Sequence, residues 1–431
     1  MIFRFGKPKR VVGIGLDGFP YSLAERLVDD GLMPNLHRLA ERGQMKRIRS
    51  VYPTVSNVAW AAFQTGKGPA DFGVYGFTEL NRDFELRIPN REDLKCETLW
   101  PRLDKAGKRW AALGVPMTFP APKLNGFLVS CFLAPTLDER AVSRKGVLDQ
   151  LQGMKYEIDI DPAVAAESPE RFKQDLKRVS EARWNTALKL LGEDEPWDLF
   201  FLHVMDTDRL HHFLWHALTQ EGPDSGFVFD FYKKLDDFLG RVVKLAGDEH
   251  LLICSDHGFC GLKWEVQLNR WLKNNGYLDY ENDPAKGYKA VKEGSRAVSL
   301  VPGRIHILRQ GRWDRGSVTD KEYEPLRREL MDRLRAVTHP DSGEVVCKQV
   351  MRKEEVFEGP QADSAPDIII DPCDGYDLKA KLGVGHLFEK GPRSGMHTYE
   401  DAMLLTGREL RSIAGAQNIM EVGRRLADYV L

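Results

Sequence analysis

The sequence of 431 residues is long enough for two or three domains, although α/β enzymes of this size often form one sheet with insertions. With 42% hydrophobic residues, 29% charged residues and a formal net charge of −2, it is typical of a soluble globular protein. This balance excludes a strongly basic nucleic-acid-binding surface and an acidic disordered tail.

The first ten residues are basic, and the apolar run that follows at 11–16 is too short for a signal peptide or a membrane span. We therefore expect no membrane segment and a cytoplasmic protein. The six cysteines form no Cys-x-x-Cys pair, so the sequence indicates neither a disulfide framework nor a thiolate zinc site.

The first buried strand is predicted at 11–16, where the run is apolar apart from two glycines, and it ends in Asp17. A dinucleotide-binding loop is excluded because the third glycine of that motif is missing and an acid stands where pyrophosphate would lie. A short helix from Met33 through Gly43 follows, with Gly43 as its C-cap.

A short strand at 47–52 leads to Ser56 and Asn57, which precede an apolar helix beginning at Val58. Ser56 thus stands at or just before a first helical turn, where backbone N–H groups and the helix dipole favour phosphate. The alternative is that Ser56 only caps the helix, and Asn57 has the same two interpretations.

Further along, strands are predicted at 109–115 and 126–132, and a long helix begins after Ser168. The apolar strand at 199–204 contains His203, which we interpret as a core histidine.

The polar stretch after this strand contains Asp208 and several histidines. If a helix begins near Asp208, then Asp208 and His212 lie one turn apart on one face, a spacing that lets both side chains bind one ion. His211 and His216 have comparable spacings, so the choice among the histidines stays open.

A helix over 225–246 returns the chain to a strand at 251–254, which ends in Asp256 and His257. An oxygen and an imidazole nitrogen suit zinc or manganese, whereas an isolated Asp-His-Gly can also be a surface turn. The alternation of strands and helices predicts an α/β fold with a mostly parallel central sheet and helices on both faces.

The pattern loosens from residue 260, and we predict that 260–365 forms an insertion over the sheet edge. The catalytic core then comprises 1–259 and 366–431, with a further core strand at 367–370. His397 precedes the last predicted strand, at 402–405.

Most of these polar candidates stand at junctions that a parallel sheet brings to one edge, which favours a single shared site. The motifs around them resemble the alkaline phosphatase superfamily, and within it the type I phosphodiesterase and nucleotide pyrophosphatase family, in the family's order. The motifs are Gly15-Leu16-Asp17-Gly18, Pro53-Thr54-Val55-Ser56, Asp208 to His212, Ser255-Asp256-His257-Gly258 and Gly395-Met396-His397.

The resemblance implies two metal sites and a nucleophilic Ser56, at a position where the family usually carries threonine. Asp17, Asp256 and His257 would hold one ion together with the Ser56 oxygen. Asp208, His212 and His397 would hold the other. The family usually carries an asparagine three residues after the nucleophile, where this sequence has Ala59. Asn57 is a candidate for binding a phosphoryl oxygen because it follows Ser56, and not by correspondence with the family.

The expected activity is hydrolysis of phosphodiester or pyrophosphate bonds in small, nucleotide-like molecules, through a phosphoseryl intermediate. Two divalent ions can stabilise the attacking and leaving oxygens. The carboxylate and imidazole ligands suit zinc, with manganese as the second choice. Alternatives are a phosphomonoesterase, a phosphoglycerate mutase-like enzyme, a phosphonate hydrolase or a non-catalytic metal-binding homologue. The residues after Ser56 lack the proline and arginine of a sulfatase signature.

Overall fold

Seven strands form the central sheet of the computed structural model, which describes residues 10–193, 196–281 and 283–431. The basic stretch at 1–9 lies outside the described residues. The five strands in the middle and at one end of the sheet run parallel, and the other two are antiparallel to their neighbours. In spatial order the strands are β2 (Gln44–Ile48), β18 (Ala402–Thr406), β8 (Leu251–Cys254), β1 (Val11–Leu16), β7 (Leu199–Val204), β5 (Trp110–Leu113) and β6 (Phe127–Val129).

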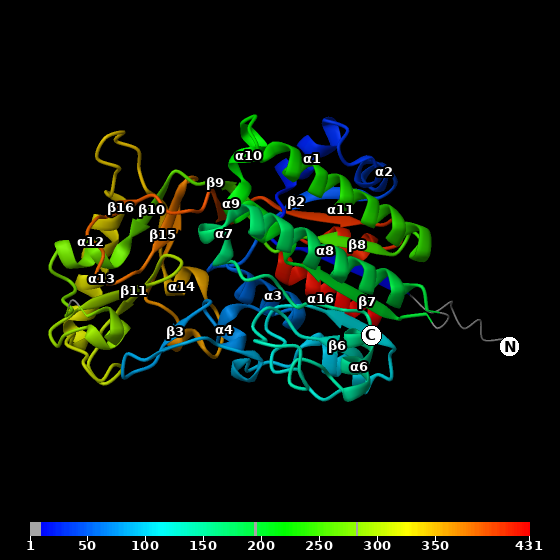
Figure 1. Ribbon diagram of the computed structural model, residues 1–431. Coiled ribbons are helices and arrows are strands. Elements are labelled where there is room, and N and C mark those ends of the chain that lie inside the picture. Colours follow the sequence, from blue (N-terminus) through cyan, green and yellow to red (C-terminus); the bar gives the residue numbers. More distant parts are fainter. Residues whose placement is uncertain (1–9, 194–195, 282) are drawn as a thin grey trace.

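Helices cover both faces of this sheet, which confirms the predicted fold class (Figure 1). Even-numbered residues of β1 pack toward one group of helices, and Val11 packs toward the other, as the alternation of a strand requires. The first face carries α1 (Tyr21–Asp29), α2 (Pro34–Arg42), α6 (Lys145–Gly153), α8 (Pro169–Leu191), α9 (Asp206–Leu214) and α11 (Ser225–Ala246). The second face carries α3 (Ser56–Thr65), α5 (Leu99–Lys105) and α16 (Ile419–Val430).

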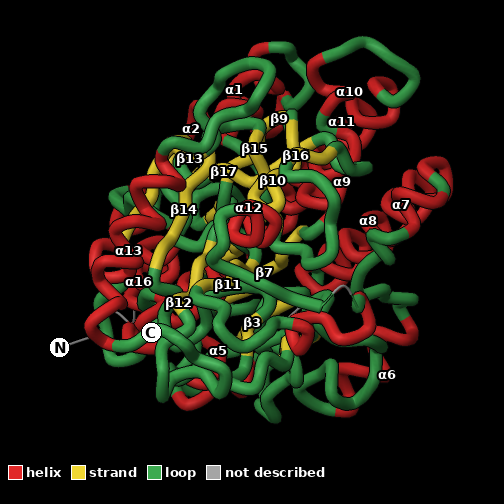
Figure 2. The backbone as a smooth tube through the Cα atoms, turned by 90° about the vertical axis from the view of Figure 1, so that its left-hand side faces the viewer, coloured by secondary structure: helices red, strands yellow, loops and turns green. Residues whose placement is uncertain are grey.

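A second group of elements has its own hydrophobic core and lies to one side of the central sheet (Figure 1). Figure 2 views the molecule from that side, so that α12, β10 and β15 stand in front. One sheet contains β15 (Tyr376–Lys379), β10 (Trp264–Gln267) and β16 (Phe388–Glu389), and another contains β11 (Ala297–Leu300), β12 (Arg304–Ile307), β14 (Ile368–Pro372) and β13 (Cys347–Arg352). Helices α12 (Leu268–Asn274), α13 (Asp320–Arg335) and α14 (Lys353–Val356) accompany them.

Short elements complete the chain. Among them, β9 (Gly258–Gly261) pairs with β17 (Gly395–Thr398), and this ribbon connects the two parts. The others are β3 (Glu79–Leu80), β4 (Leu86–Arg87), α4 (Pro69–Phe72), α7 (Val164–Glu167), α10 (His216–Thr219), α15 (Arg411–Ala414) and the 3₁₀ helices Arg91–Asp93, Pro284–Ala290 and Ala362–Ser364.

The strands predicted at 109–115 and 126–132 are shorter in the structure, at Trp110–Leu113 and Phe127–Val129. Two other predicted strands differ in position or in sheet. The strand expected at 47–52 is β2 at Gln44–Ile48. It ends at Ile48 because Ile48 pairs with Ala402, the first residue of its antiparallel partner β18. The strand expected at 367–370 exists as β14, but it pairs with β12 and β13 and does not belong to the central sheet. An apolar run shows that a strand is buried without showing in which sheet.

Within the described ranges, no helix combines the length and apolar character needed to cross a membrane.

Candidate active site

The predicted site residues meet at the carboxyl edge of three adjacent strands. Asp17 directly follows β1, Asp256 follows β8 after one intervening residue, and Asp208 lies in the first turn of α9, which follows β7. Thr207 donates a hydrogen bond to the backbone carbonyl of Asp17 (2.6 Å), which fixes the start of α9 against the end of β1. The parallel order of β8, β1 and β7 therefore determines where the three carboxylates stand.

Asp17, Asp256 and His257 form the first ligand group, in which one ligand atom of each residue lies within 4.8 Å of the others. Nε2 of His257 lies 3.5 Å from Oδ1 of Asp17 and 3.4 Å from Oδ2 of Asp256. All three side chains are fully buried.

Asp208, His212 and His397 form the second ligand group by the same criterion. Oδ1 of Asp208 lies 3.4 Å from Nε2 of His212 and 3.1 Å from Nε2 of His397. The two groups adjoin, because the rings of His257 and His397 stack with their centroids 3.7 Å apart.

The three histidines share one orientation. Nδ1 of each lies near a backbone carbonyl: that of Gly258 for His257 (3.0 Å), of Gly395 for His212 (3.3 Å) and of Thr54 for His397 (3.2 Å). When Nδ1–H donates to such a carbonyl, the neutral ring presents the lone pair of Nε2, as it does in metal sites. Nε2 of His212 and Nε2 of His397 are then only 3.1 Å apart, an arrangement that a shared cation stabilises.

The buried charges also fit divalent cations. Burial, and then the neighbouring Asp17, raise the pKa of Asp256 well above its usual value. Gly18 N–H donates to Oδ1 of Asp256 (3.1 Å), whereas its buried Oδ2 has no hydrogen-bond partner among the described residues. Burial alone would also raise the pKa of Asp208, but His212 and His397 hold it well below its usual range. Asp17 and Asp256 are adjacent buried carboxylates, and such a pair requires either protons or a cation.

Ser56 is the first residue of α3, and its side chain does not cap the helix. Its hydroxyl donates to Oδ1 of Asp17 (3.0 Å) and lies 3.5 Å from Nε2 of His257. The hydroxyl therefore stands at the edge of the first ligand group. The next residue, Asn57, is completely buried, and its amide has no hydrogen-bond partner in the described part of the chain. Its proposed contact with a phosphoryl oxygen stays a prediction.

The other polar candidates after β7 lie elsewhere. Nδ1 of His211 lies 2.8 Å from the Gly18 carbonyl, and its Nε2 contacts the Tyr232 hydroxyl, so both of its ring nitrogens are engaged. His216 faces Asp224 at 3.5 Å. Asp206 faces the buried Arg183 at 3.8 Å. The structure therefore brings His212, and neither His211 nor His216, to Asp208 and His397.

Two side chains that hold Asp17 were not identified from the sequence as site residues. Oδ2 of Asp17 lies 2.9 Å from Nε1 of Trp60 and 2.8 Å from Nε2 of His203. His203 was interpreted as a core histidine, and it is buried, but it also contacts a candidate metal ligand. In the β1–β7 pairing, His203 lies opposite Gly15, two residues before Asp17. This proximity to Asp17 could be recognised only once the strand order is known.

Arg209 was also missed. Its guanidinium lies 2.7 Å from Asp159 and 3.5 Å from Oδ2 of Asp208. Because Asp159 belongs to a distant loop, spacing in the sequence carried no sign of this network. Arg209 approaches Oδ2 of this candidate ligand, whereas His212 and His397 approach Oδ1.

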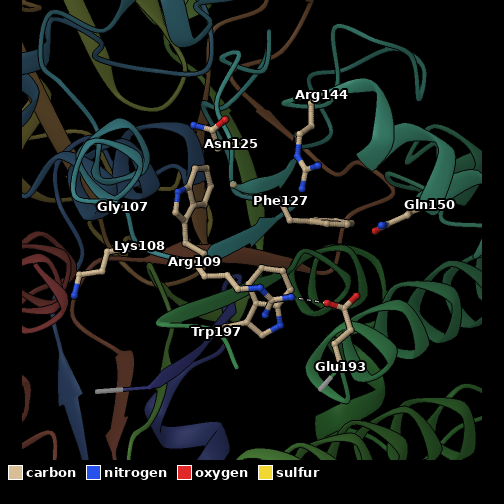
Figure 3. A pocket seen from close by; sticks show the side chains of 11 residues that line it. Gly107, Lys108, Arg109, Asn125, Phe127, Arg144, Gln150, Glu193 and Trp197 are labelled. Atoms are coloured by element: carbon tan, nitrogen blue, oxygen red, sulfur yellow. Dashed lines mark hydrogen bonds and ion pairs between the residues drawn. The ribbon is translucent and has the colours of Figure 1, made fainter. Parts of the chain in front are cut away.

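A hollow of about 320 Å³ lies at the opposite edge of the sheet, beside the first residues of β5 and β6. Figure 3 shows Arg109 in this pocket reaching Glu193, 2.7 Å away. The guanidinium carbon of Arg109 lies over the Trp197 ring, 3.7 Å from the ring centroid. None of the candidate site residues is among its described lining residues, so this hollow is separate from the two ligand groups.

The chain is similar to several solved structures. One is phosphonoacetate hydrolase from Sinorhizobium meliloti 1021 in complex with phosphonoformate, with 17% identity, a TM-score of 0.67, and coverage of 98% of this chain and 96% of that chain. Murine ectonucleotide pyrophosphatase/phosphodiesterase 5 has 15% identity and a TM-score of 0.54, with coverage of 98% and 95%. The human counterpart has 16% identity and a TM-score of 0.53, with coverage of 98% and 94%.

At these identities the similarity shows the fold alone. No curated protein matches the sequence. The family model of type I phosphodiesterase/nucleotide pyrophosphatase, in contrast, matches residues 11–400, which include every candidate ligand. The chain therefore belongs to the type I phosphodiesterase/nucleotide pyrophosphatase family.

Proposed function

We propose that this protein is a metal-dependent hydrolase of phosphodiester or pyrophosphate bonds in small, nucleotide-like molecules, with Ser56 as its nucleophile. The observation that carries the proposal is the arrangement of the three histidines. Each has Nδ1 at a backbone carbonyl and Nε2 at a carboxylate, and the Ser56 hydroxyl stands beside the first ligand group.

Asp17, Asp256, His257 and the Ser56 oxygen would hold one divalent ion, and Asp208, His212 and His397 would hold the other. Carboxylate and imidazole ligands favour zinc, with manganese as the second choice. When bound, such ions would lower the pKa of the serine hydroxyl and neutralise charge on the leaving oxygen.

The proposed reaction has two steps. The Ser56 oxygen attacks phosphorus in line with the leaving group, and the bond between phosphorus and the leaving oxygen breaks, which gives a phosphoseryl intermediate. Water then attacks the same phosphorus and releases Ser56. Because the first N–H groups of a helix have no intrahelical acceptor, those at the start of α3 can stabilise a phosphoryl oxygen beside Ser56.

The part of the chain at 260–365 is proposed to set the substrate specificity as an insertion next to the core formed by 1–259 and 366–431. The pairing of β14 with β12 and β13, and of β15 and β16 with β10, favours a return to the core after residue 389. The cytoplasmic location stays a prediction.

The test is steady-state hydrolysis of bis-p-nitrophenyl phosphate, p-nitrophenyl phosphate and a p-nitrophenyl phosphonate by chelated enzyme to which zinc or manganese is returned. The proposal expects metal-restored turnover with a preference for the diester. A preference for the monoester would indicate a phosphatase or mutase-like enzyme, and a preference for the phosphonate would indicate a phosphonate hydrolase. Bound metal without turnover of any ester would overturn the proposal.

A further inference from the structure

A buried arginine of α8, Arg183, contacts both elements that lead into the second ligand group. Its Nη2 donates a hydrogen bond to the backbone carbonyl of His203 on β7 (2.7 Å), and its Nη1 lies 3.8 Å from Oδ2 of Asp206, the first residue of α9. The His203 side chain in turn contacts Asp17 of the first ligand group. One guanidinium therefore lies next to a residue that holds the first group and next to the helix that carries the second.

The side chain of Asp206 leaves α9 on the side away from the second ligand group. Asp206 and Asp208 are two residues apart, which in a helix corresponds to a rotation of about 200°. Asp208 contacts His212 and His397, whereas Asp206 faces α8. Helix α9 accordingly packs against α8 and against β17, the strand that carries His397. A change in the contact between Arg183 and Asp206 would therefore turn or shift the first turn of α9 and displace Asp208.

The guanidinium fits between these elements because residue 114 is a glycine. Gly114 follows β5, which neighbours β7 in the sheet, and has a φ of 72°. A Cβ at this position would lie 2.8 Å from Nη2 of Arg183 and 3.4 Å from the carbonyl oxygen of His203. The backbone after β5 thus leaves room for the hydrogen bond between Arg183 and His203, and a larger residue would press on it.

Stability alone does not explain this ion pair. Both Arg183 and Asp206 are buried, so both charges lose their hydration. Nε and Nη1 of Arg183 and Oδ2 of Asp206 have no hydrogen-bond partner within the described chain, so the pair recovers little of that loss. Apolar side chains can often replace such a pair without loss of stability. They would not supply the planar guanidinium, whose fixed geometry sets the distance between the β7 carbonyl and the α9 carboxylate.

We propose that Arg183 is a positioning residue that fixes the second ligand group relative to the first, by holding the start of α9 against the end of β7. The inference rests on the proposed function, in which each group binds one divalent ion. Arg183 is not itself a ligand. It places Asp208 where this carboxylate can share an ion with His212 and His397, so its loss should weaken binding of the second ion and leave the first in place.

The experiment compares metal binding with folding stability in the same variants. Chelated full-length protein is titrated calorimetrically with zinc, and its unfolding by urea is measured without metal, so that bound ions do not contribute to the stability. In R183M/D206L an apolar pair replaces the ion pair. R183K keeps the charge but lacks the planar fork that contacts both partners. H212A identifies the second ion, which this variant should fail to bind.

We expect the Kd of the second ion to rise about tenfold or more in R183M/D206L and in R183K, as for other groups that orient a metal ligand, while the Kd of the first ion stays the same. R183M/D206L should unfold at a urea concentration no lower than that of the unmodified protein. R327M is the matched control, because Arg327 is a buried arginine of α13 that pairs with Glu354 (2.8 Å) in the second part of the molecule. It should lose stability and keep both Kd values.

An unchanged Kd of the second ion in either Arg183 variant would overturn the inference. An equal rise of this Kd in R327M would also overturn it, because weaker binding would then follow from lower stability alone. An unmodified protein that binds two ions and hydrolyses no ester would overturn the proposed function and not the positioning role. An unmodified protein that binds fewer than two ions would overturn both.

Discussion

Trp60 donates its indole N–H to Oδ2 of Asp17 over 2.9 Å and leaves Oδ1 of that carboxylate facing the Ser56 hydroxyl. Trp60 lies four residues after Ser56 on α3, so one helix carries both the proposed nucleophile and the group that orients its neighbouring ligand. The indole fits because residue 15 is glycine: a Cβ there would lie 2.3 Å from the Trp60 ring. We regard Trp60 as a positioning residue.

Replacing Trp60 with phenylalanine should weaken metal binding at the first ligand group roughly tenfold to a hundredfold, because the carboxylate loses a hydrogen bond that fixes its direction. Competition with a chromogenic chelator measures this change. W100F is the matched control, since the Trp100 indole donates to Gln64 (2.8 Å) and does not contact Asp17. Equal metal affinities of W60F and the unmodified protein would show that the bond to Asp17 has no role in metal binding.

Removing the Ser56 hydroxyl should abolish turnover and leave the metal content nearly intact. We expect S56A to lower kcat roughly a thousandfold or more, because the variant lacks the hydroxyl that forms the proposed covalent intermediate. Metal analysis by mass spectrometry should still find both ions, held by the six remaining ligands. S22A, which removes an exposed serine hydroxyl bonded to Asp401, should retain full activity. Substantial hydrolysis by S56A would refute the nucleophile assignment.

Much of the core could be predicted from the sequence because its strands are buried on both faces. Each of the apolar runs that give β1, β7 and β8 is followed within two residues by an aspartate, and parallel strands bring such ends to one edge. The residues of both ligand groups could thus be proposed before their geometry was known. Their grouping came from the family resemblance, since spacing along the chain does not show which carboxylate faces which histidine.

The rest depended on contacts between distant segments. His203 looks like any core residue until the pairing of β7 with β1 places it next to Asp17. The choice between His211 and His212 depends on where α9 begins, and it begins at Asp206, two residues earlier than the sequence indicated. Arg209 could not be recognised because its partner Asp159 lies fifty residues away.

The two histidines of α9 should respond differently to mutation. H212A should reduce the bound metal from about two ions per chain to about one, because the second ligand group keeps only Asp208 and His397. H211F should retain both ions, since the His211 ring contacts the Gly18 carbonyl and the Tyr232 hydroxyl. Metal content after dialysis measures both outcomes.

H211F should still cost about 1–3 kcal/mol in the free energy of unfolding, because two buried polar groups lose a partner. Loss of one ion in H211F with two retained in H212A would mean that the ligand assignment is off by one residue.

Asp371 should make the stability of the protein depend on pH, independently of the metal ligands. It lies on β14 and is 7% exposed. Burial raises its pKa from 3.8 to about 6, partly offset by Tyr52 and Lys348. A folded-state pKa above the unfolded value means that the folded protein binds the proton more tightly. The resulting stabilisation is complete below about pH 4 and is lost as the pH rises through about 6.

The comparison of the unmodified protein with D371N isolates this effect, because both proteins carry the same ligand groups and the pH dependence of metal binding cancels. Between about pH 4 and pH 7, the unmodified protein should lose up to about 3 kcal/mol of unfolding free energy relative to D371N. Urea unfolding at several pH values measures the difference. A difference that stays constant with pH would show that Asp371 is ionised at its usual pH despite its burial, which would require water or a cation at the carboxylate.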